Sequence, residues 1–337
     1  FVLSSILRSV KAFDHARALI SPDAVIIHQS LAGLGAILRR RTKARAWVYM
    51  CLSLAHEEYL SRTPPATTPV DSLRRILNAQ VRQWIERVVI ERCARVVVLS
   101  RFMWQRVLAV HGIPEDKLRL VAGATDPDRF RPPEDPVSVR EQLKLPLNRV
   151  VLFTVRNLVP RMGLENLLQA IAILGEEGQD LLLVIGGEGP LRPALDQLIR
   201  DLGLTDRARL AGFIAEDDLS NYYQAADLVL LPTHQLEGFG LVTVEALACG
   251  TPVLGTPVGA IPEVLARVDP GLLADGTDGT ALATAIRRIL RRFCDQPGEQ
   301  ERLSLKGRAL VEQDYTWDRH SEQLDLILRE VCPSGTR

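Results

Sequence analysis

Lysine is scarce in this chain of 337 residues, although basic side chains in general are not. It occurs only at positions 11, 43, 117, 144 and 306, and arginine supplies the rest of the 41 basic side chains. The 41 acidic side chains bring the formal net charge to zero, and no acidic or basic tail stands out. Bulk charge therefore does not indicate a nucleic-acid partner. Arginine is the better planar phosphate ligand, but a GC-rich genome produces the same bias.

Cysteine is infrequent too, and its pattern excludes two kinds of stabilised domain. The five cysteines stand at positions 51, 93, 249, 294 and 332, an odd number without CxxC spacing. This pattern indicates neither a disulfide framework nor a zinc site, and it is consistent with a reducing cytosol.

Long uninterrupted apolar runs are missing as well. Residues 1–7 are too few for the apolar region of a signal peptide, and no basic residue precedes them. The nearly uncharged stretch 247–266 contains glycine and proline, which exclude a simple membrane-spanning helix. The chain begins at Phe1 without methionine, in what looks like the middle of a domain, so we expect a fragment.

Short apolar, β-rich segments alternate with amphipathic ones, which is typical of α/β proteins with parallel sheets covered by helices. In the first half the expected strands are 24–27, 46–50, 95–99 and 118–121. Residues 71–92 predict a long amphipathic helix. Its apolar residues near one face are Leu73, Ile76, Leu77, Val81, Trp84, Ile85 and Val88. The polar, proline-containing stretch 129–148 is the best domain boundary.

The second half repeats this rhythm more clearly. The expected strands are 150–155, 181–185, 208–211, 228–231 and 252–255, and the expected helices lie near 164–176, 190–202, 215–225, 240–249 and 280–292. This order predicts a doubly wound sheet whose ligand sits at the carboxyl ends of the strands.

Two carboxylates in residues 234–250 carry the strongest functional signal. Glu237 precedes Gly238, Phe239 and Gly240, and Glu245 is the only charge in the apolar helical stretch that follows. A charge on a buried helix is costly unless it is paired, and a glycine-flanked helix N-terminus favours a phosphate. The segment therefore predicts a phosphate site; the alternative is a satisfied glutamate beside an ordinary glycine turn.

The spacing of the two glutamates resembles the Glu-x7-Glu motif of retaining glycosyltransferases of family 4, which have the GT-B fold. Segments 221–227, 230–233 and 250–263 are also similar to that family, and the resemblance runs from Pro22 to Leu328. It implies two Rossmann-like domains facing across a cleft, the first of them incomplete. The implied domains are an acceptor-side domain at 1–145, a nucleotide-sugar domain at 146–314, and a final helix at 315–332 that crosses back to the first.

The resemblance also assigns roles in the second domain. Family members usually hold the donor diphosphate with an Arg and a Lys, where this chain has Asn157 and Met162. Arg156 and Arg161 each lie one residue earlier, and we expect them to substitute, beside the amides of Gly240 and Leu241. The alternative is two surface arginines on a loop.

Further donor-site residues follow from the same resemblance. Gly187 and Glu188 lie in a glycine turn that borders the donor site in the family, although a tight turn alone is an equal alternative. Phe213 is expected to flank the nucleotide base. Asp126 and Asp128 form a DxD sequence, whose position indicates a turn and not a metal site.

The first domain departs from the family pattern. Aligned on Glu58 and Tyr59, Leu52 stands where the family commonly has a histidine close to the reacting sugar. His56 and His28 are nearby candidates, and a structural or exposed role is the simpler interpretation of both.

These observations predict a retaining glycosyltransferase that moves a hexose from a UDP- or GDP-type sugar to an acceptor hydroxyl, without a metal or other cofactor. The catalytic candidates are Glu237, Arg156 and Arg161, and Glu245 is expected to bind the ribose. The acceptor is a glycan, a lipid or a small molecule, in glycan, polysaccharide or glycolipid synthesis. We expect a cytoplasmic protein, with peripheral contact at the inner face of the membrane left open. The rivals are a nearly inactive nucleotide-sugar-binding relative and a glycoside hydrolase that uses Glu237 and Glu245.

Overall fold

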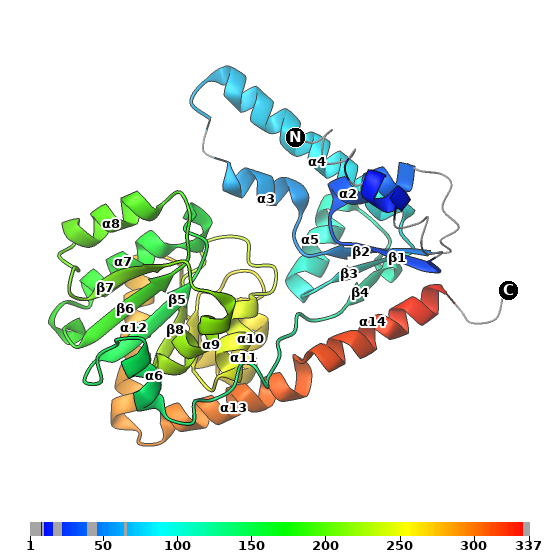
Figure 1. The fold of residues 1–337 in the computed structure, drawn as a ribbon. Coiled ribbons are helices and arrows are strands. Elements are labelled where there is room, and N and C mark those ends of the chain that lie inside the picture. The colour runs from blue at the N-terminus through cyan, green and yellow to red at the C-terminus, as the bar shows by residue number, and fades with distance from the viewer. Residues whose placement is uncertain (1–7, 9, 16–21, 39–45, 64–65, 333–337) are drawn as a thin grey trace. The chain divides into compact units, whose positions relative to one another are not determined.

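The computed structural model describes residues 8, 10–15, 22–38, 46–63 and 66–332. The chain divides into two compact units, residues 1–122 with 320–337 and residues 123–319 (Figure 1). Within the described residues, no helix has both the length and the apolar character needed to cross a membrane. Residues 1–7, which are too few for the apolar region of a signal peptide, lie outside the described residues.

The first unit is built on a parallel sheet that has four strands among the described residues, in the order β1-β2-β3-β4. The strands are β1 (Ala24–Ile27), β2 (Ala46–Cys51), β3 (Arg95–Val98) and β4 (Leu118–Leu120). Helices α2 (Ser30–Leu38), α3 (Ala55–Arg62), α4 (Pro69–Arg92) and α5 (Arg101–His111) connect or flank them. The four strands expected from the sequence are confirmed to within one residue at each end, because their buried, β-branched segments are short and sharply bounded.

The last helix, α14 (Trp317–Val331), packs on the first sheet. Ile327 is buried against Val48, Met50 and Val97. At its end Glu330 pairs with Arg95 at 2.6 Å and with Arg119 at 2.5 Å, and these two guanidiniums, Arg119 first, lower the pKa of Glu330 to about 2. The final helix thus covers a sheet formed by the beginning of the chain.

The second unit holds a five-stranded parallel sheet in the order β7-β6-β5-β8-β9. Its strands are β5 (Val150–Val155), β6 (Leu181–Gly186), β7 (Ala208–Gly212), β8 (Leu228–Leu231) and β9 (Val253–Gly255). The helices are α6 (Pro136–Gln142), α7 (Leu164–Ile173), α8 (Arg192–Asp201), α9 (Glu216–Ala225), α10 (Leu241–Ala248), α11 (Ile261–Val268), α12 (Gly279–Asp295) and α13 (Glu299–Asp314). Helix α7 packs against α8 and α12, and α10 packs against α9, α11 and α13. The doubly wound order predicted from the sequence is the one observed.

The boundary between the units lies earlier than the expected position after residue 145. Helix α6 packs on α9, and Arg140 pairs with Asp227 at 2.7 Å, which fixes residues 136–142 to the second unit. Thr125 also forms an isolated bridge with Thr316. The proline-containing stretch is therefore not a free linker but a segment bound along the second unit.

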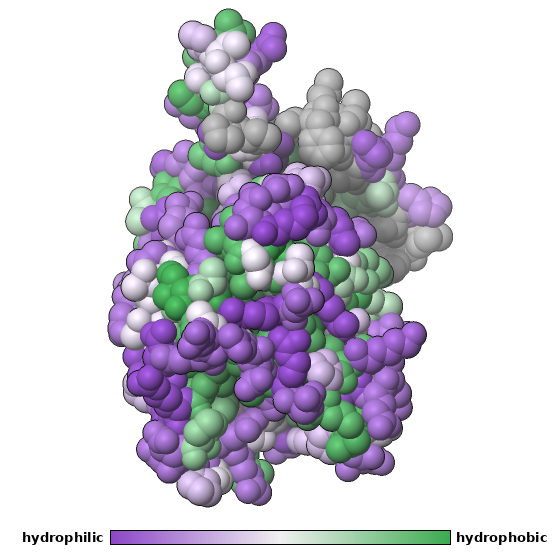
Figure 2. Space-filling view, turned by 90° about the vertical axis from the view of Figure 1, so that its left-hand side faces the viewer, coloured by the Kyte–Doolittle hydropathy of each residue, from purple (hydrophilic) through white to green (hydrophobic). Residues whose placement is uncertain are grey.

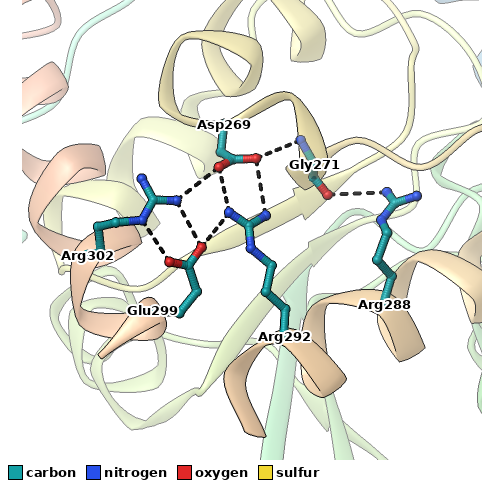
Figure 3. A network of polar contacts seen from close by, with 6 residues as sticks. All are labelled: Asp269, Gly271, Arg288, Arg292, Glu299 and Arg302. Atoms are coloured by element: carbon teal, nitrogen blue, oxygen red, sulfur yellow. Dashed lines mark hydrogen bonds and ion pairs between the residues drawn. The ribbon is translucent and has the colours of Figure 1, made fainter. Parts of the chain in front are cut away.

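One cluster of charged residues ties three helical segments of the second unit together (Figure 3). Asp269 follows α11 and binds Arg292 of α12 at 2.7 Å and Arg302 of α13 at 3.0 Å. Glu299 binds both arginines as well. Arg292, the largest contributor, holds the pKa of Asp269 well below its usual range. The cluster fastens α11 to α13, the helix that also packs on α10.

Helix α4 forms where the sequence predicts it, but most of its apolar face is not buried. Ile85 is buried, whereas Leu73, Leu77, Val81 and Trp84 are each about half exposed or more. The Thr68 side chain caps the helix by accepting a hydrogen bond from the Asp71 amide at 3.1 Å. Periodicity thus located the helix correctly but did not reveal that most of its apolar face is exposed.

Candidate functional site

The site in the second unit lies where its sheet reverses direction. Strand β5 has β6 on one side and β8 on the other, so the carboxyl ends of β5 and β8 flank a topological switch point. Arg156 is the first residue after β5, and Thr233 and Glu237 follow β8 in the loop that leads to α10. The fold therefore brings together two segments that the sequence places about 80 residues apart.

Arg156, Thr233 and Glu237 form a buried polar cluster. Arg156 Nη2 donates to Glu237 Oε2 at 2.7 Å and to Thr233 Oγ1 at 2.5 Å, and the Thr233 hydroxyl also donates to Glu237 at 3.2 Å. The side chains of Arg156 and Glu237 are only 6% and 12% exposed. The two buried charges depend on each other, because removing either one would leave the other buried without a counter-charge, which strongly destabilises the fold.

One donor of this cluster has no partner. Arg156 Nε is buried without a hydrogen-bond partner among the described residues, and the same holds for the Thr243 hydroxyl of α10. Buried polar atoms are nearly always satisfied in folded proteins. The two atoms therefore mark a place where the protein alone does not complete its hydrogen bonds.

The backbone around Glu237 is held by a second segment. Gly259 has φ 61°, and a Cβ there would stand 2.1 Å from the Glu237 carbonyl oxygen. The amide of Ala260 donates to that same oxygen at 3.0 Å. Only glycine fits so close an approach, so the 250–263 segment serves to fix the loop that carries Glu237.

The N-terminus of α10 is open beside this cluster. Gly240 caps the helix with φ 83° and gives no side-chain hydrogen bond. A Cβ on Gly240 would lie 3.4 Å from Glu237 Cγ, so the helix start and the carboxylate adjoin. The first amides of a helix have no acceptor within it and carry partial positive charge. Leu241, the first helical residue, has an exposed side chain.

Glu245, although it lies in an apolar helix, has a hydrogen-bond partner within the protein. The Tyr223 hydroxyl, from α9, donates to Glu245 Oε2 at 2.8 Å. Burial raises the pKa of the Glu245 carboxyl, and the Tyr223 hydrogen bond acts in the opposite direction. Tyr223 and Thr233 both lie in segments whose likeness to the family was noted, yet neither received a role from the sequence, because their partners lie 22 and 77 residues away.

Arg161 lies in the loop between β5 and α7, and its contacts are to the backbone opposite. Its Nη1 donates to the Leu236 carbonyl at 2.7 Å, and its own carbonyl accepts from the amides of His234 and Gln235 at 2.8 and 3.1 Å. Leu236 has the strained value φ 59°. Arg161 therefore holds the loop that precedes Glu237.

The remaining candidates in the second unit fall into two groups. Gly187 has φ 117°, and a Cβ there would stand 1.9 Å from the Arg156 carbonyl oxygen, so the turn of Gly187 contacts the backbone of the site. Glu188 beside it is exposed. Phe213, after β7, is 73% exposed. Phe239 points elsewhere: its ring is buried against Tyr315 with centroids 5.7 Å apart.

The helix expected to open on Pro190 begins two residues later, at Arg192, because residues 190–191 form a turn. The Leu191 amide donates to the Leu158 carbonyl at 3.0 Å in that turn. Asp126 and Asp128 also form a turn, in which Asp126 Oδ1 accepts from the amides of Asp128 and Arg129.

The first unit carries a pocket of its own, of about 530 Å³. Leu52 and His28 line it, together with Tyr49, Tyr59 and Arg62. His56, the other histidine considered, does not line the pocket, and burial lowers its pKa.

A buried carboxylate that no sequence pattern predicted lies behind this pocket. Glu86 of α4 is fully buried and accepts from the Tyr49 hydroxyl at 2.7 Å and from the Ala55 amide at 3.2 Å. His111 Nε2 lies 3.2 Å from Glu86 Oε2. A glutamate amid arginines on a long helix is typical of a solvated face, so only the three-dimensional contacts reveal this network.

Comparisons with known proteins point to one family. Residues 138–309 match the family described as glycosyl transferases group 1. The chain is 32% identical over 213 residues to a D-inositol 3-phosphate glycosyltransferase of Streptomyces avermitilis, covering 60% of this chain and 44% of that one. It is 29% identical over 306 residues to a GDP-mannose-dependent alpha-(1-6)-phosphatidylinositol monomannoside mannosyltransferase of Mycolicibacterium smegmatis, covering 88% and 73%.

Among solved structures, sucrose-phosphate synthase from Thermosynechococcus elongatus is similar with a TM-score of 0.80 and 26% identity, over 97% of this chain and 78% of that one. The two parallel sheets thus have the arrangement of strands found in GT-B proteins. The chain spans less than half the length of the Streptomyces relative. With a matching segment that covers half of its residues and includes Arg156, Glu237 and Glu245, the chain belongs to the glycosyl transferases group 1 family.

Proposed function

We propose that this protein is a retaining hexosyltransferase that takes its sugar from a UDP- or GDP-type donor bound at the second unit. The observation that carries the proposal is the buried Arg156–Glu237 pair beside the open N-terminus of α10. A positive guanidinium, free helical amides and a carboxylate are the groups that a negatively charged diphosphate and a sugar with several hydroxyls require. The Mycolicibacterium relative's name specifies GDP-mannose, which supports a donor of this class.

The roles follow from the charges. Arg156 contributes positive charge and the Gly240–Leu241 backbone offers amides to the departing diphosphate, where negative charge develops. Glu237, already oriented by Arg156 and Thr233, accepts hydrogen bonds from sugar hydroxyls and stabilises positive charge at the ring. No part of this scheme requires a metal ion, because arginine and a helix terminus supply the positive charge.

Six further residues complete the proposed donor site. Arg161 keeps the loop of Glu237 in place and adds positive charge near the phosphates. Glu245 binds the ribose hydroxyls, Gly187 and Glu188 border the nucleotide, and Phe213, which is largely exposed, offers a stacking surface to the base. Phe239 contributes through packing and not through its ring face.

The acceptor is proposed to enter the pocket of the first unit. Its lining combines hydroxyls of Ser30, Tyr49 and Ser53 with the charges of Arg62, Arg82 and Glu58. Glu58 pairs with Arg62 at 2.6 Å, so Arg82 supplies the net positive charge of the lining. Such a lining suits a polyhydroxylated acceptor that carries a negative group, in agreement with the inositol phosphate in the Streptomyces relative's name. The proposed products belong to glycan or glycolipid synthesis, and the proposed location is cytoplasmic.

The test is calorimetric titration of wild type, Arg156→Ala and Arg161→Ala with UDP, GDP and the matching nucleosides. We expect both variants to lose affinity for the diphosphates and to bind the nucleosides nearly as wild type does. A lost charge-assisted hydrogen bond costs about 1.5–3 kcal/mol, or roughly ten- to a hundredfold in affinity. Arg209, in β7, is a control of the same residue type away from the site.

Equal affinity of both variants for the diphosphates would place the clamp elsewhere. Loss of nucleoside and diphosphate binding together would indicate a folding defect, which circular dichroism of each variant checks.

A second candidate function, donor binding with little or no transfer, rests on Leu52. This leucine is 44% exposed and lines the first-unit pocket, where the family commonly has a histidine. A turnover assay with donor sugar, followed both for transfer and for donor hydrolysis, separates the two functions. Tight donor binding without either product would favour the second.

A further inference from the structure

Arg192, the first residue of α8, places its guanidinium at the carboxyl edge of the second sheet. A Cβ on Gly212, the last residue of β7, would stand 3.3 Å from Arg192 Nη1. Gly212 is the register partner of Gly186 at the end of β6, and its carbonyl accepts from the Gly187 amide at 2.7 Å. The guanidinium therefore lies beside the strand ends and the glycine turn that border the proposed donor site.

The donors of Arg192 are not used within the protein. Its half-buried side chain forms no hydrogen bond or ion pair with any residue that the structure describes. By contrast, Arg200 on the same helix donates to Gln197 Oε1 at 2.6 Å, and Arg156 is held by Glu237. An arginine carries five N–H donors in a rigid fork, so those of Arg192 are available to a ligand.

The residue that follows Gly212 adds an aromatic surface. Phe213 is 73% exposed, more than any other large apolar side chain among the described residues. Figure 2 views the molecule from the side on which α8 lies in Figure 1, and apolar patches alternate there with hydrophilic side chains. An exposed ring near an unpaired guanidinium suits a flat ligand that has an apolar face and a polar edge.

The position of Arg192 fits the base of a nucleotide and not its phosphates. The groups proposed to hold the diphosphate, Arg156 and the start of α10, follow β5 and β8. In the order β7-β6-β5-β8-β9, strand β7 lies two strands from β5, or about 10 Å. A nucleoside is of about this length, so a diphosphate held after β5 and β8 allows its base to reach the end of β7.

We propose that Arg192 recognises the base of the sugar donor and makes the site selective for guanine, an inference that rests on the donor site of the proposed function. Guanine presents two acceptors, O6 and N7, side by side on one edge, and the arginine fork can donate to both. The donor is then a GDP sugar, which agrees with the GDP-mannose in the Mycolicibacterium relative's name.

The other common bases match this fork less well. Adenine has an amino donor beside its N7 acceptor, so one arm of the arginine would face a donor. Uracil separates its two carbonyl oxygens by an N–H donor, so the fork reaches only one of them. Arginine therefore favours guanine over both.

The test is calorimetric titration with GDP, UDP, ADP and 7-deaza-GDP, which has a carbon in place of N7. The variants are Arg192→Ala, which removes the guanidinium, and Arg192→Lys, which keeps the charge but not the fork. The matched control is Arg200→Ala, near the other end of α8. Because alanine favours helices and Arg192 makes no described side-chain hydrogen bond, the variants are expected to fold, and thermal melting checks this.

We expect wild type and the control to bind GDP more tightly than UDP or ADP, and to bind 7-deaza-GDP more weakly than GDP. Both Arg192 variants should lose about five- to hundredfold in GDP affinity and keep their UDP affinity. The lysine variant fails because a single ammonium does not meet both acceptors with the geometry of the fork.

A wild type that prefers UDP or ADP would overturn the proposal. So would an Arg192→Lys variant that binds GDP as tightly as wild type, since charge alone then suffices. Equal losses of GDP and UDP affinity in Arg192→Ala would also overturn it, because the residue would then act on the part that both nucleotides share.

Arg156→Ala keeps a failure of this proposal apart from a failure of the proposed function. If Arg156→Ala weakens the binding of every diphosphate while Arg192→Ala leaves the preference for GDP unchanged, the donor site stands and guanine recognition by Arg192 is wrong. If wild type binds none of the diphosphates, the proposed function fails and this proposal fails with it.

Discussion

The two units hold buried carboxylates in contrasting environments. In the first unit, Glu86 is fully buried and its oxygens receive the Tyr49 hydroxyl and the Ala55 amide. His111 Nε2 lies close by, and His111 Nδ1 is buried without a partner among the described residues. In the second unit, Glu237 pairs with Arg156, whose Nε has no partner among the described residues, next to a helix terminus without a side-chain cap. A carboxylate whose hydrogen bonds the protein completes positions other residues, whereas an incomplete cluster at the ends of strands invites a ligand.

The same contrast separates the segments that surround each carboxylate. Glu86 fixes the start of α3 through the Ala55 amide and the wall of the pocket through Tyr49, and it is not itself one of the residues that line that pocket. Glu237 is fixed by others: Gly259 and Ala260 meet its carbonyl, and Arg161 holds the loop before it. One glutamate organises its neighbours, and the other is organised by them.

The largest effect on stability is expected from Glu86→Ala. It removes the acceptor of the Tyr49 hydroxyl and the Ala55 amide and leaves His111 facing an apolar space, which costs about 3 kcal/mol or more. The control is Glu91→Ala on the same helix, whose half-exposed side chain pairs with Arg87 and should change stability by less than about 1 kcal/mol. Urea unfolding followed by far-ultraviolet circular dichroism compares them.

If the two alanine variants unfold at the same urea concentration, Glu86 has no special structural role and the contrast between the units fails. Tyr49→Phe sharpens the result, since it removes one donor of the network and keeps the ring in place. It should cost about 1 kcal/mol.

How much of this was predictable depends on how far apart in the chain the partners lie. The strands of both sheets and the placement of Arg156 and Glu237 at strand ends follow from local apolar segments and from the parallel order. Tyr223 and Thr233 could not be assigned, because each meets a partner that only the folded sheet brings near. The predicted boundary at 145 was too late because Arg140 pairs across 87 residues with Asp227.

Helix α4 shows the corresponding limit for surfaces. Periodicity identifies a helix with an apolar face, but not whether protein, lipid or water lies against that face. The buried Glu86 on the same helix was missed for a related reason, since the sequence around it is rich in charges and resembles a solvated surface. The sequence therefore predicted elements well and environments poorly.

A smaller effect, on ligand binding, is expected from Glu245. Burial raises the pKa of this carboxyl, so it takes up a proton at a pH above the ordinary carboxyl range. If the ionised form accepts ribose hydroxyls, nucleoside affinity should fall as pH decreases through that raised pKa. Glu245→Gln should bind about 1.5–3 kcal/mol more weakly and lose the pH dependence. Calorimetry with uridine and guanosine avoids titration of the ligand's own phosphate.

Tyr223→Phe gives the control for that titration. The Tyr223 hydroxyl donates to Glu245 and acts to lower its pKa, so without it the fall in affinity should begin at a higher pH. An identical pH profile in wild type, Glu245→Gln and Tyr223→Phe would remove Glu245 from the ribose site.

The smallest expected effect comes from Glu330, the ion pair partner that holds α14 to the first sheet. Arg119 and Arg95 lower its pKa to about 2, so the pair contributes stability above the ordinary glutamate pKa of about 4.3. That contribution is lost as pH falls from there through about 2. Because the side chain is 37% exposed, water screens the pair, and Glu330→Gln should cost less than about 1 kcal/mol at neutral pH.

Thermal melting at neutral pH and at about pH 3 measures this contribution. The difference in melting temperature between wild type and variant should shrink in acid. A difference that stays constant in acid would mean that the ion pair contributes no stability and that Ile327 and its apolar neighbours hold α14 to the sheet.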